Sequence, residues 1–72
     1  MEISKDKATE IITEGIAQIT QATNAKELAD FECFAHGSAV TMWDLGIFTQ
    51  IEHTANYDNI VATAKKRLEE LR

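Results

Sequence analysis

The chain has 72 residues with one cysteine, twelve acidic and seven basic side chains, and a formal net charge of −5. This length allows a single small globular domain, predicted over residues 1–72, and one cysteine excludes a disulfide-stapled secreted scaffold. No apolar run approaches the roughly 18 residues of a membrane span, so we expect a cytoplasmic protein without membrane contact. A domain of this size has marginal stability, and a homodimer is therefore an open alternative to a monomer.

The first element expected along the chain is a helix over residues 5–22. Ser4 is a suitable N-cap, and the apolar residues follow helical spacing. These are Ala8, Ile12, Ile16 and Ile19. Asn24 predicts the end of this helix. The segment from Asn24 to Glu27 has the pattern of a capping box, which favours a short helical turn after it.

The middle of the chain is predicted as a three-stranded antiparallel meander, with strands near 30–35, 39–43 and 47–53. His36 and Gly37 would form a two-residue turn between the first two strands. Gly46 would close a three-residue loop in the left-handed region. The stretch is rich in β-branched and aromatic residues, which favour strands.

A helical interpretation of the same stretch is the alternative. Apolar residues there also fit a period of 3.6, although Gly46 would then lie inside a helix at a cost of about 1 kcal/mol relative to Ala. These residues are Val40, Trp43, Ile47, Phe48 and Ile51. A last helix is predicted over residues 57–71 from its apolar stripe and its C-terminal cations. The predicted fold class is α+β, with an N-terminal helix, the meander and a C-terminal helix. The alternative is an all-α four-helix bundle.

The predicted meander places an aromatic and aliphatic patch on one face of the sheet, which is typical of the centre of a protein interface. The expected partner-binding residues are Trp43, Phe34, Ile47 and Ile51, with Glu32 and Asp44 at the rim. Burial of this face beneath the helices is the competing interpretation. In the helical alternative Trp43 would belong to the core.

The acidic charge argues against direct nucleic-acid binding, because it repels phosphate, and it favours a protein partner with a basic surface. Simple solubility explains the same charge. The size, acidity and lack of catalytic motifs are similar to those of small phage or mobile-element proteins that inhibit or regulate a host protein. The predicted function is therefore a non-catalytic protein–protein interaction module that acts by stoichiometric binding. The alternative is a small homo-oligomer that binds a small molecule or nucleotide between subunits.

Three further side chains have metal-binding or nucleophilic chemistry. Cys33 and His36 form half of a zinc motif at best, and no second pair follows at ligand spacing. In the meander, Cys33 and His53 would point to opposite faces, which excludes a nucleophile–base pair. We therefore expect no enzyme activity, cofactor or metal. Cys33 is predicted to be a small buried hydrophobe and the two histidines to be solvated.

Overall fold

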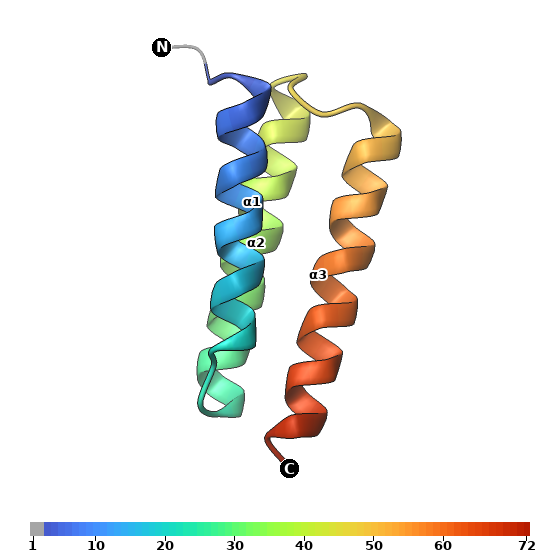
Figure 1. Ribbon diagram of the computed structural model, residues 1–72. Helices are drawn as coiled ribbons and strands as arrows, with labels where there is room; N and C mark the ends of the chain where they lie inside the picture. Colours follow the sequence, from blue (N-terminus) through green and yellow to red (C-terminus); the bar gives the residue numbers. More distant parts are fainter. Residues whose placement is uncertain (1–2) are drawn as a thin grey trace.

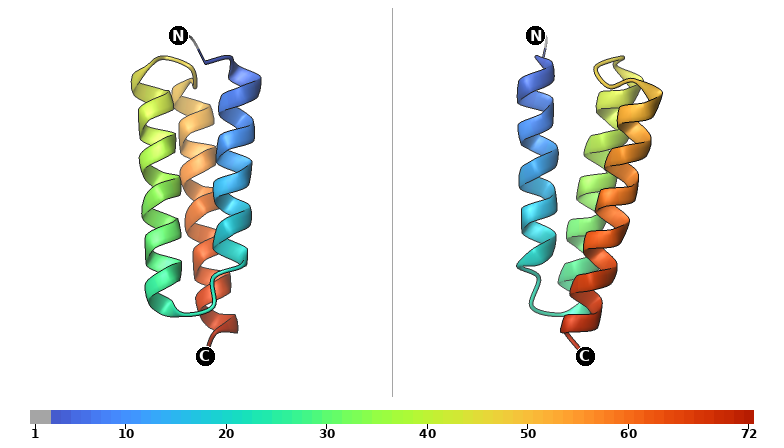
Figure 2. Two further views of the ribbon diagram at one scale, coloured as in Figure 1. Left: turned by 90° about the vertical axis from the view of Figure 1, so that its left-hand side faces the viewer. Right: turned by 45° about the vertical axis from the view of Figure 1, so that its right-hand side comes forward.

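The computed structural model describes residues 3–72, which form three helices joined by two short connections (Figure 1). These are α1 (Lys5–Thr20), α2 (Ala25–Asp44) and α3 (Gln50–Glu70). α1 and α3 run in the same direction and α2 runs opposite to both, as short connections between neighbours require (Figure 1). Each helix packs against the other two (Figure 2), in a bundle of 40 × 23 × 16 Å.

The predicted α+β fold is wrong, since no strand occurs within residues 3–72. The predicted strands 30–35 and 39–43 both lie inside α2. The third, 47–53, covers the connection to α3 and the first residues of that helix. The all-α alternative fits the structure in class, although the described residues form three helices where four were expected.

α2 is helical because its local signals agree with its burial pattern. The Asn24 side chain accepts a hydrogen bond from the Glu27 N–H (2.8 Å), so the predicted cap begins a full helix rather than a short turn. Only two of its 20 residues, Val40 and Thr41, are β-branched. Its buried residues recur at helical spacing: Leu28, Ala35, Ala39 and Met42. The predicted turn at His36 and Gly37 is wrong, because both residues lie inside this helix.

Gly46 ends α2 rather than closing a hairpin. Its φ of +77° confirms the predicted left-handed conformation, which glycine adopts without steric cost. The N–H of Ile47 donates to the Met42 carbonyl (3.0 Å) and that of Gly46 to the Trp43 carbonyl (2.9 Å). These two bonds form a Schellman motif, which satisfies the last carbonyls of a helix. The same glycine signal therefore terminates a helix here.

Side-chain caps begin the other two helices. The Ser4 hydroxyl accepts from the Lys7 N–H (3.1 Å), which confirms the predicted N-cap of α1. α3 begins at Gln50, seven residues earlier than expected, because Thr49 and Glu52 form a capping box. Lys5 Nζ lies 2.6 Å from Glu52 Oε2 and joins the starts of α1 and α3. This hydrogen bond and the one from the Thr49 N–H lower the pKa of Glu52 below its ordinary value.

The core is narrow and rich in small side chains. Its buried apolar residues are Ala8, Ile12, Ile19, Ala22, Leu28, Ala35, Ala39, Met42, Phe48, Ile60 and Ala64. Five of these eleven are alanines, and a Cβ on buried Gly15 would lie 3.4 Å from the Ala35 Cβ. α1 and α2 therefore pack closely. A core of this size leaves several large apolar side chains of residues 3–72 exposed.

Candidate functional site

The four apolar residues predicted as one contact patch do not lie together. Trp43 is at the end of α2, and Ile47 is half-buried against the core in the connection to α3. Phe34 is nine residues before Trp43 on α2, which at about 100° per residue puts the two on opposite sides of that helix. Ile51, on the first turn of α3, is 83% exposed. The patch depended on the meander and is not formed. Partner contact by each side chain remains a prediction.

The structure instead brings Trp43 onto a groove between α2 and α3. The indole of Trp43 stacks on the His53 ring, with centroids 4.3 Å apart and planes 6° from parallel. Further along the same pair of helices, the His36 and Tyr57 rings lie 5.2 Å apart. Two pairs of rings from opposite helices therefore form the upper part of this groove.

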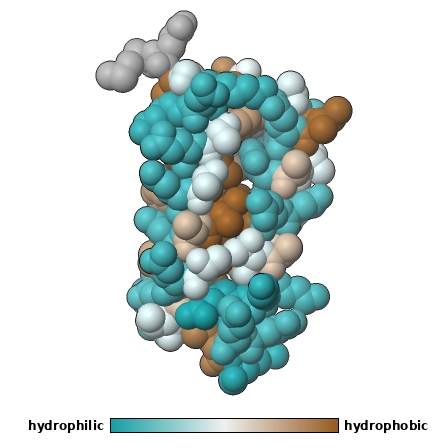
Figure 3. All heavy atoms as spheres, in the orientation of Figure 1, coloured by the Kyte–Doolittle hydropathy of each residue, from teal (hydrophilic) through white to brown (hydrophobic). Residues whose placement is uncertain are grey.

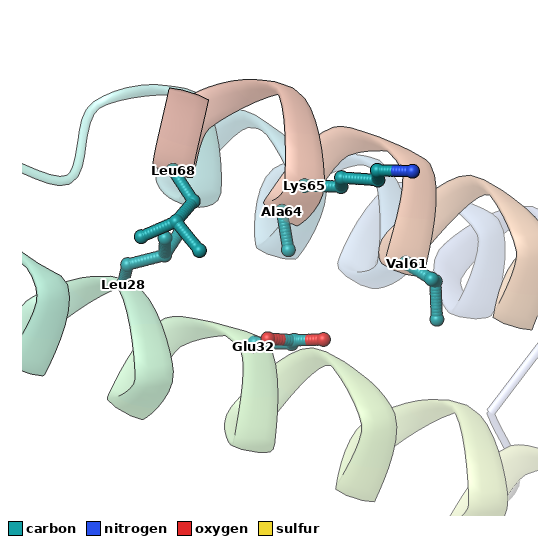
Figure 4. Close-up of a pocket in the computed structure, with 6 residues that line it drawn as sticks. All are labelled: Leu28, Glu32, Val61, Ala64, Lys65 and Leu68. Atoms are coloured by element: carbon teal, nitrogen blue, oxygen red, sulfur yellow. The ribbon is translucent and has the colours of Figure 1, made fainter. Parts of the chain in front are cut away.

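The groove deepens toward the C-terminal end of α3 (Figure 4). A depression of about 220 Å³ is lined there by Leu28, Glu32, Val61, Ala64, Lys65 and Leu68. Leu28 and Leu68 approach one another across its end, and Glu32 lies on its α2 wall (Figure 4). Glu32 Oε2 is 3.5 Å from His36 Nε2, so this carboxylate lies between the depression and the ring pairs above it. We call the surface along this seam the α2–α3 groove. It comprises Leu28, Glu32, His36 and Trp43 of α2 and His53, Tyr57, Val61, Ala64, Lys65 and Leu68 of α3.

Some of the exposed apolar side chains of residues 3–72 line this groove. The large apolar residues with substantial exposure are Phe34, Val40, Trp43, Leu45, Ile51, Tyr57 and Val61. Trp43 (38% exposed), Tyr57 (54%) and Val61 (36%) belong to the groove. Val40 lies one helical turn before Trp43, on the same side of α2. Figure 3 shows another side of the bundle, between α1 and α3, where a central apolar patch is visible among hydrophilic side chains.

The polar groups of the groove are only partly satisfied. His53 Nδ1 is buried and has no hydrogen-bond partner within residues 3–72. His36 is close to Glu32, and that pair is an ion pair only when the imidazole is protonated. The predicted rim residue Glu32 thus lies in the groove wall. The other, Asp44, ends α2 beside Trp43 and is exposed.

Sequence reasoning missed the part played by His36, His53, Tyr57 and Val61. The histidines were predicted to be solvated turn and strand-end residues, whereas both are half-buried and in contact with an aromatic ring. One available signal was on the last helix. Its apolar side extends beyond buried Ile60 and Ala64 to Tyr57 and Val61, which is wider than a small core requires.

The remaining candidate chemistry is dispersed. Cys33 is exposed on α2, so its predicted burial is wrong. Within residues 3–72, no three His, Cys, Asp or Glu side chains are grouped closely enough to hold a metal ion. None of the three described helices is both long enough and apolar enough to cross a membrane.

Comparisons with known proteins identify no relative. No protein-family model matches the chain, and neither the curated proteins nor the solved structures contain a significant match. The proposed function therefore depends on the α2–α3 groove.

Proposed function

We propose that this chain is a non-catalytic interaction module that binds a protein partner with a basic surface, in a stoichiometric complex, through the α2–α3 groove. The observation that carries the proposal is Trp43, which lies flat on His53 yet keeps 38% of its surface exposed. Aromatic side chains that are rigidly held and still accessible are the typical anchors of protein interfaces.

The surroundings of Trp43 support the same function. Tyr57 and Val61 add apolar surface along the groove, and Asp44 and Asp58 are exposed acidic residues next in sequence to Trp43 and Tyr57. An apolar centre with a charged rim is the usual composition of an interface. The net charge of −5 favours a basic partner. The exposed, unpaired thiol of Cys33 suits a reducing compartment, and we place the module in the cytoplasm.

A small-molecule site within one chain has less support. The depression of about 220 Å³ is smaller than the roughly 300–1,000 Å³ of typical ligand pockets, and it is open rather than enclosed. A small-molecule or nucleotide site between subunits stays an untested prediction. We therefore carry forward protein binding alone.

The test is a titration of the purified partner with matched variants. A protein retained by the wild-type chain from cells of its source is identified, expressed separately and titrated by calorimetry. We expect a 1:1 complex that Trp43→Ala weakens by about tenfold or more, the effect of losing an interface anchor. Val61→Lys is the second variant, since it changes an exposed wall residue should Trp43→Ala unfold the chain. Ala55→Lys is the control, because it adds the same charge at an exposed position of the same helix outside the groove.

Retention of affinity by both groove variants would contradict the proposal. So would an equal loss in Ala55→Lys, because that would indicate a general effect of added positive charge. Circular dichroism of each variant establishes that it is folded before its affinity is compared.

A further inference from the structure

The α2–α3 groove has the dimensions of a helix-binding site. Leu28 and Trp43 mark its two ends on α2 and are 15 residues apart, which corresponds to about 22 Å along a helix axis. Between them, Glu32 and Ala64 both line the depression, and the His36 and Tyr57 rings lie 5.2 Å apart. The groove therefore extends over about four helical turns, with a depression in its lower half and paired rings across its upper half.

The architecture favours a helical occupant over one that binds as an added β-strand. An extended peptide gains affinity by pairing with an exposed sheet edge, and residues 3–72 contain no strand to supply one. A helix satisfies its own backbone hydrogen bonds and needs only a matching apolar surface. α1 already packs against both α2 and α3 (Figure 2). A partner helix bound in the α2–α3 groove would, like α1, pack against both α2 and α3. The result would be a four-helix arrangement.

Charge distinguishes a foreign helix from a second copy of this chain. Glu32 lies in the groove, and Asp44 and Asp58 directly follow Trp43 and Tyr57. Among residues 3–72, neither Asp44 nor Asp58 has an ion-pair partner. Lys65 is the cation that lines the depression at the Leu28 and Leu68 end of the groove. Two copies would bring together surfaces that each belong to a chain of net charge −5, whereas a basic helix would neutralise them.

We propose that the occupant of the α2–α3 groove is an amphipathic helix of the partner protein. It carries an apolar stripe about four turns long with Lys or Arg on its flanks. This inference rests on the proposed protein-binding function and specifies the partner segment. The apolar stripe packs between Trp43, Tyr57 and Val61, and the flanking cations face Asp44 and Asp58.

The experiment is a selection from random peptides of about 18 residues, long enough for the four turns required. The library is displayed on phage and selected on the immobilised chain. Enriched peptides are synthesised without tryptophan and titrated, with Trp43, the single tryptophan of the chain, as the fluorescent reporter. Circular dichroism of the mixtures measures helix gained on binding.

We expect enriched sequences with apolar residues at i, i+3 or i+4, and i+7, and with flanking Lys or Arg. Their binding should add helix and should weaken by about tenfold or more in Val61→Lys while Ala55→Lys binds normally. Peptides without the periodicity, peptides with acidic flanks, equal binding to Val61→Lys, or no enrichment would each overturn the inference. Sedimentation of the chain without peptide measures whether it forms a dimer. A dimer weakened by Val61→Lys would put a second copy in the groove and would also overturn it.

The two proposals fail in distinguishable ways. If the peptides fail while the purified cellular partner still loses affinity with Trp43→Ala and Val61→Lys, the helical occupant is wrong and the protein-binding function stands. If that partner is insensitive to both variants, both proposals are wrong.

Discussion

The two seams that α2 forms with its neighbours differ in construction. Toward α1, Gly15 approaches Ala35 so closely that an added Cβ would lie 3.4 Å from the alanine Cβ. Toward α3, the upper seam holds aromatic and imidazole rings that keep part of their surface exposed, and it contains a buried, unpartnered His53 nitrogen. Small side chains let α1 and α2 approach closely at Gly15 and Ala35, whereas paired rings fill the upper seam between α2 and α3 and keep part of their surface exposed.

This difference separates stability from recognition in a small chain. Complete burial gives the largest stabilisation for each apolar atom, and a domain of this size has few such positions. Large apolar groups beside the groove contribute less to folding, because they remain partly in water. They are the groups available to a partner. Substitutions that treat the two regions differently can therefore test the comparison.

The largest contrast is expected between neighbouring residues on α3. Ile60 is 0% exposed and Val61 is 36% exposed. Ile60→Ala should lower the free energy of unfolding by about 2–5 kcal/mol, the cost of a core cavity. Val61→Ala should cost less than about 1 kcal/mol, because the removed methyl groups are partly solvated. Urea unfolding followed by circular dichroism measures both, and equal losses would show that the groove is as much a part of the core as Ile60.

A smaller contrast is expected between two helical glycines. Gly15→Leu should destabilise the chain by about 1–3 kcal/mol, because the larger side chain must push α1 away from Ala35 of α2. Apart from its chain neighbours and the nearby backbone of α2, no heavy atom of the described residues would lie within 4 Å of a Cβ on Gly37. Gly37→Leu should therefore raise the free energy of unfolding by about 0.5–1 kcal/mol through helix propensity. Thermal unfolding compares the pair, and destabilisation by both variants would mean that α2 is also covered on its outer side.

The smallest effect is expected at the ion pair between α1 and α3. The pKa of Glu52 is lowered by its hydrogen bonds with Lys5 and the Thr49 N–H, so the folded state binds this proton less readily than the unfolded state. The associated stability is present above the unfolded carboxyl pKa and is lost as pH falls through the lowered folded value. Glu52→Gln keeps an amide oxygen to accept the Thr49 N–H and removes the charge.

Glu52→Gln should lower Tm by at most a few degrees near neutral pH, since exposed ion pairs contribute little. The difference from wild type should shrink as pH falls below the ordinary value of 4.5 and as salt is added. Thermal scans across pH measure this. A difference that is constant from neutral to acidic pH would show that the charge of Glu52 is not the cause.

Several local features could be predicted from the sequence because they depend on neighbouring residues alone. Ser4 caps α1, Asn24 begins α2 and Gly46 adopts positive φ, each through side-chain or backbone chemistry within a few residues. The stripes of α1 and α3 were also readable, since both place isoleucine and alanine at helical spacing. The start of α3 was placed too late, because the apolar stripe and C-terminal cations that predicted this helix lie in its later turns, whereas its cap is Thr49.

The choice between strand and helix over residues 30–53 could not be made from local signals. A glycine with positive φ closes a hairpin loop or ends a helix equally well, and aromatic residues in this stretch fit periods of two and of 3.6. Tertiary packing decided it. Leu28, Ala35, Ala39 and Met42 share a buried side only if the segment is helical, and α1 can approach that side closely because Gly15 faces Ala35. The same packing put Trp43 on His53 rather than beside Phe34, and so decided where the groove lies.

The sequence by itself determined the caps, the glycine turn and the two outer helices, since these depend on nearby residues. The middle helix and the candidate site depend on contacts between residues far apart in the chain.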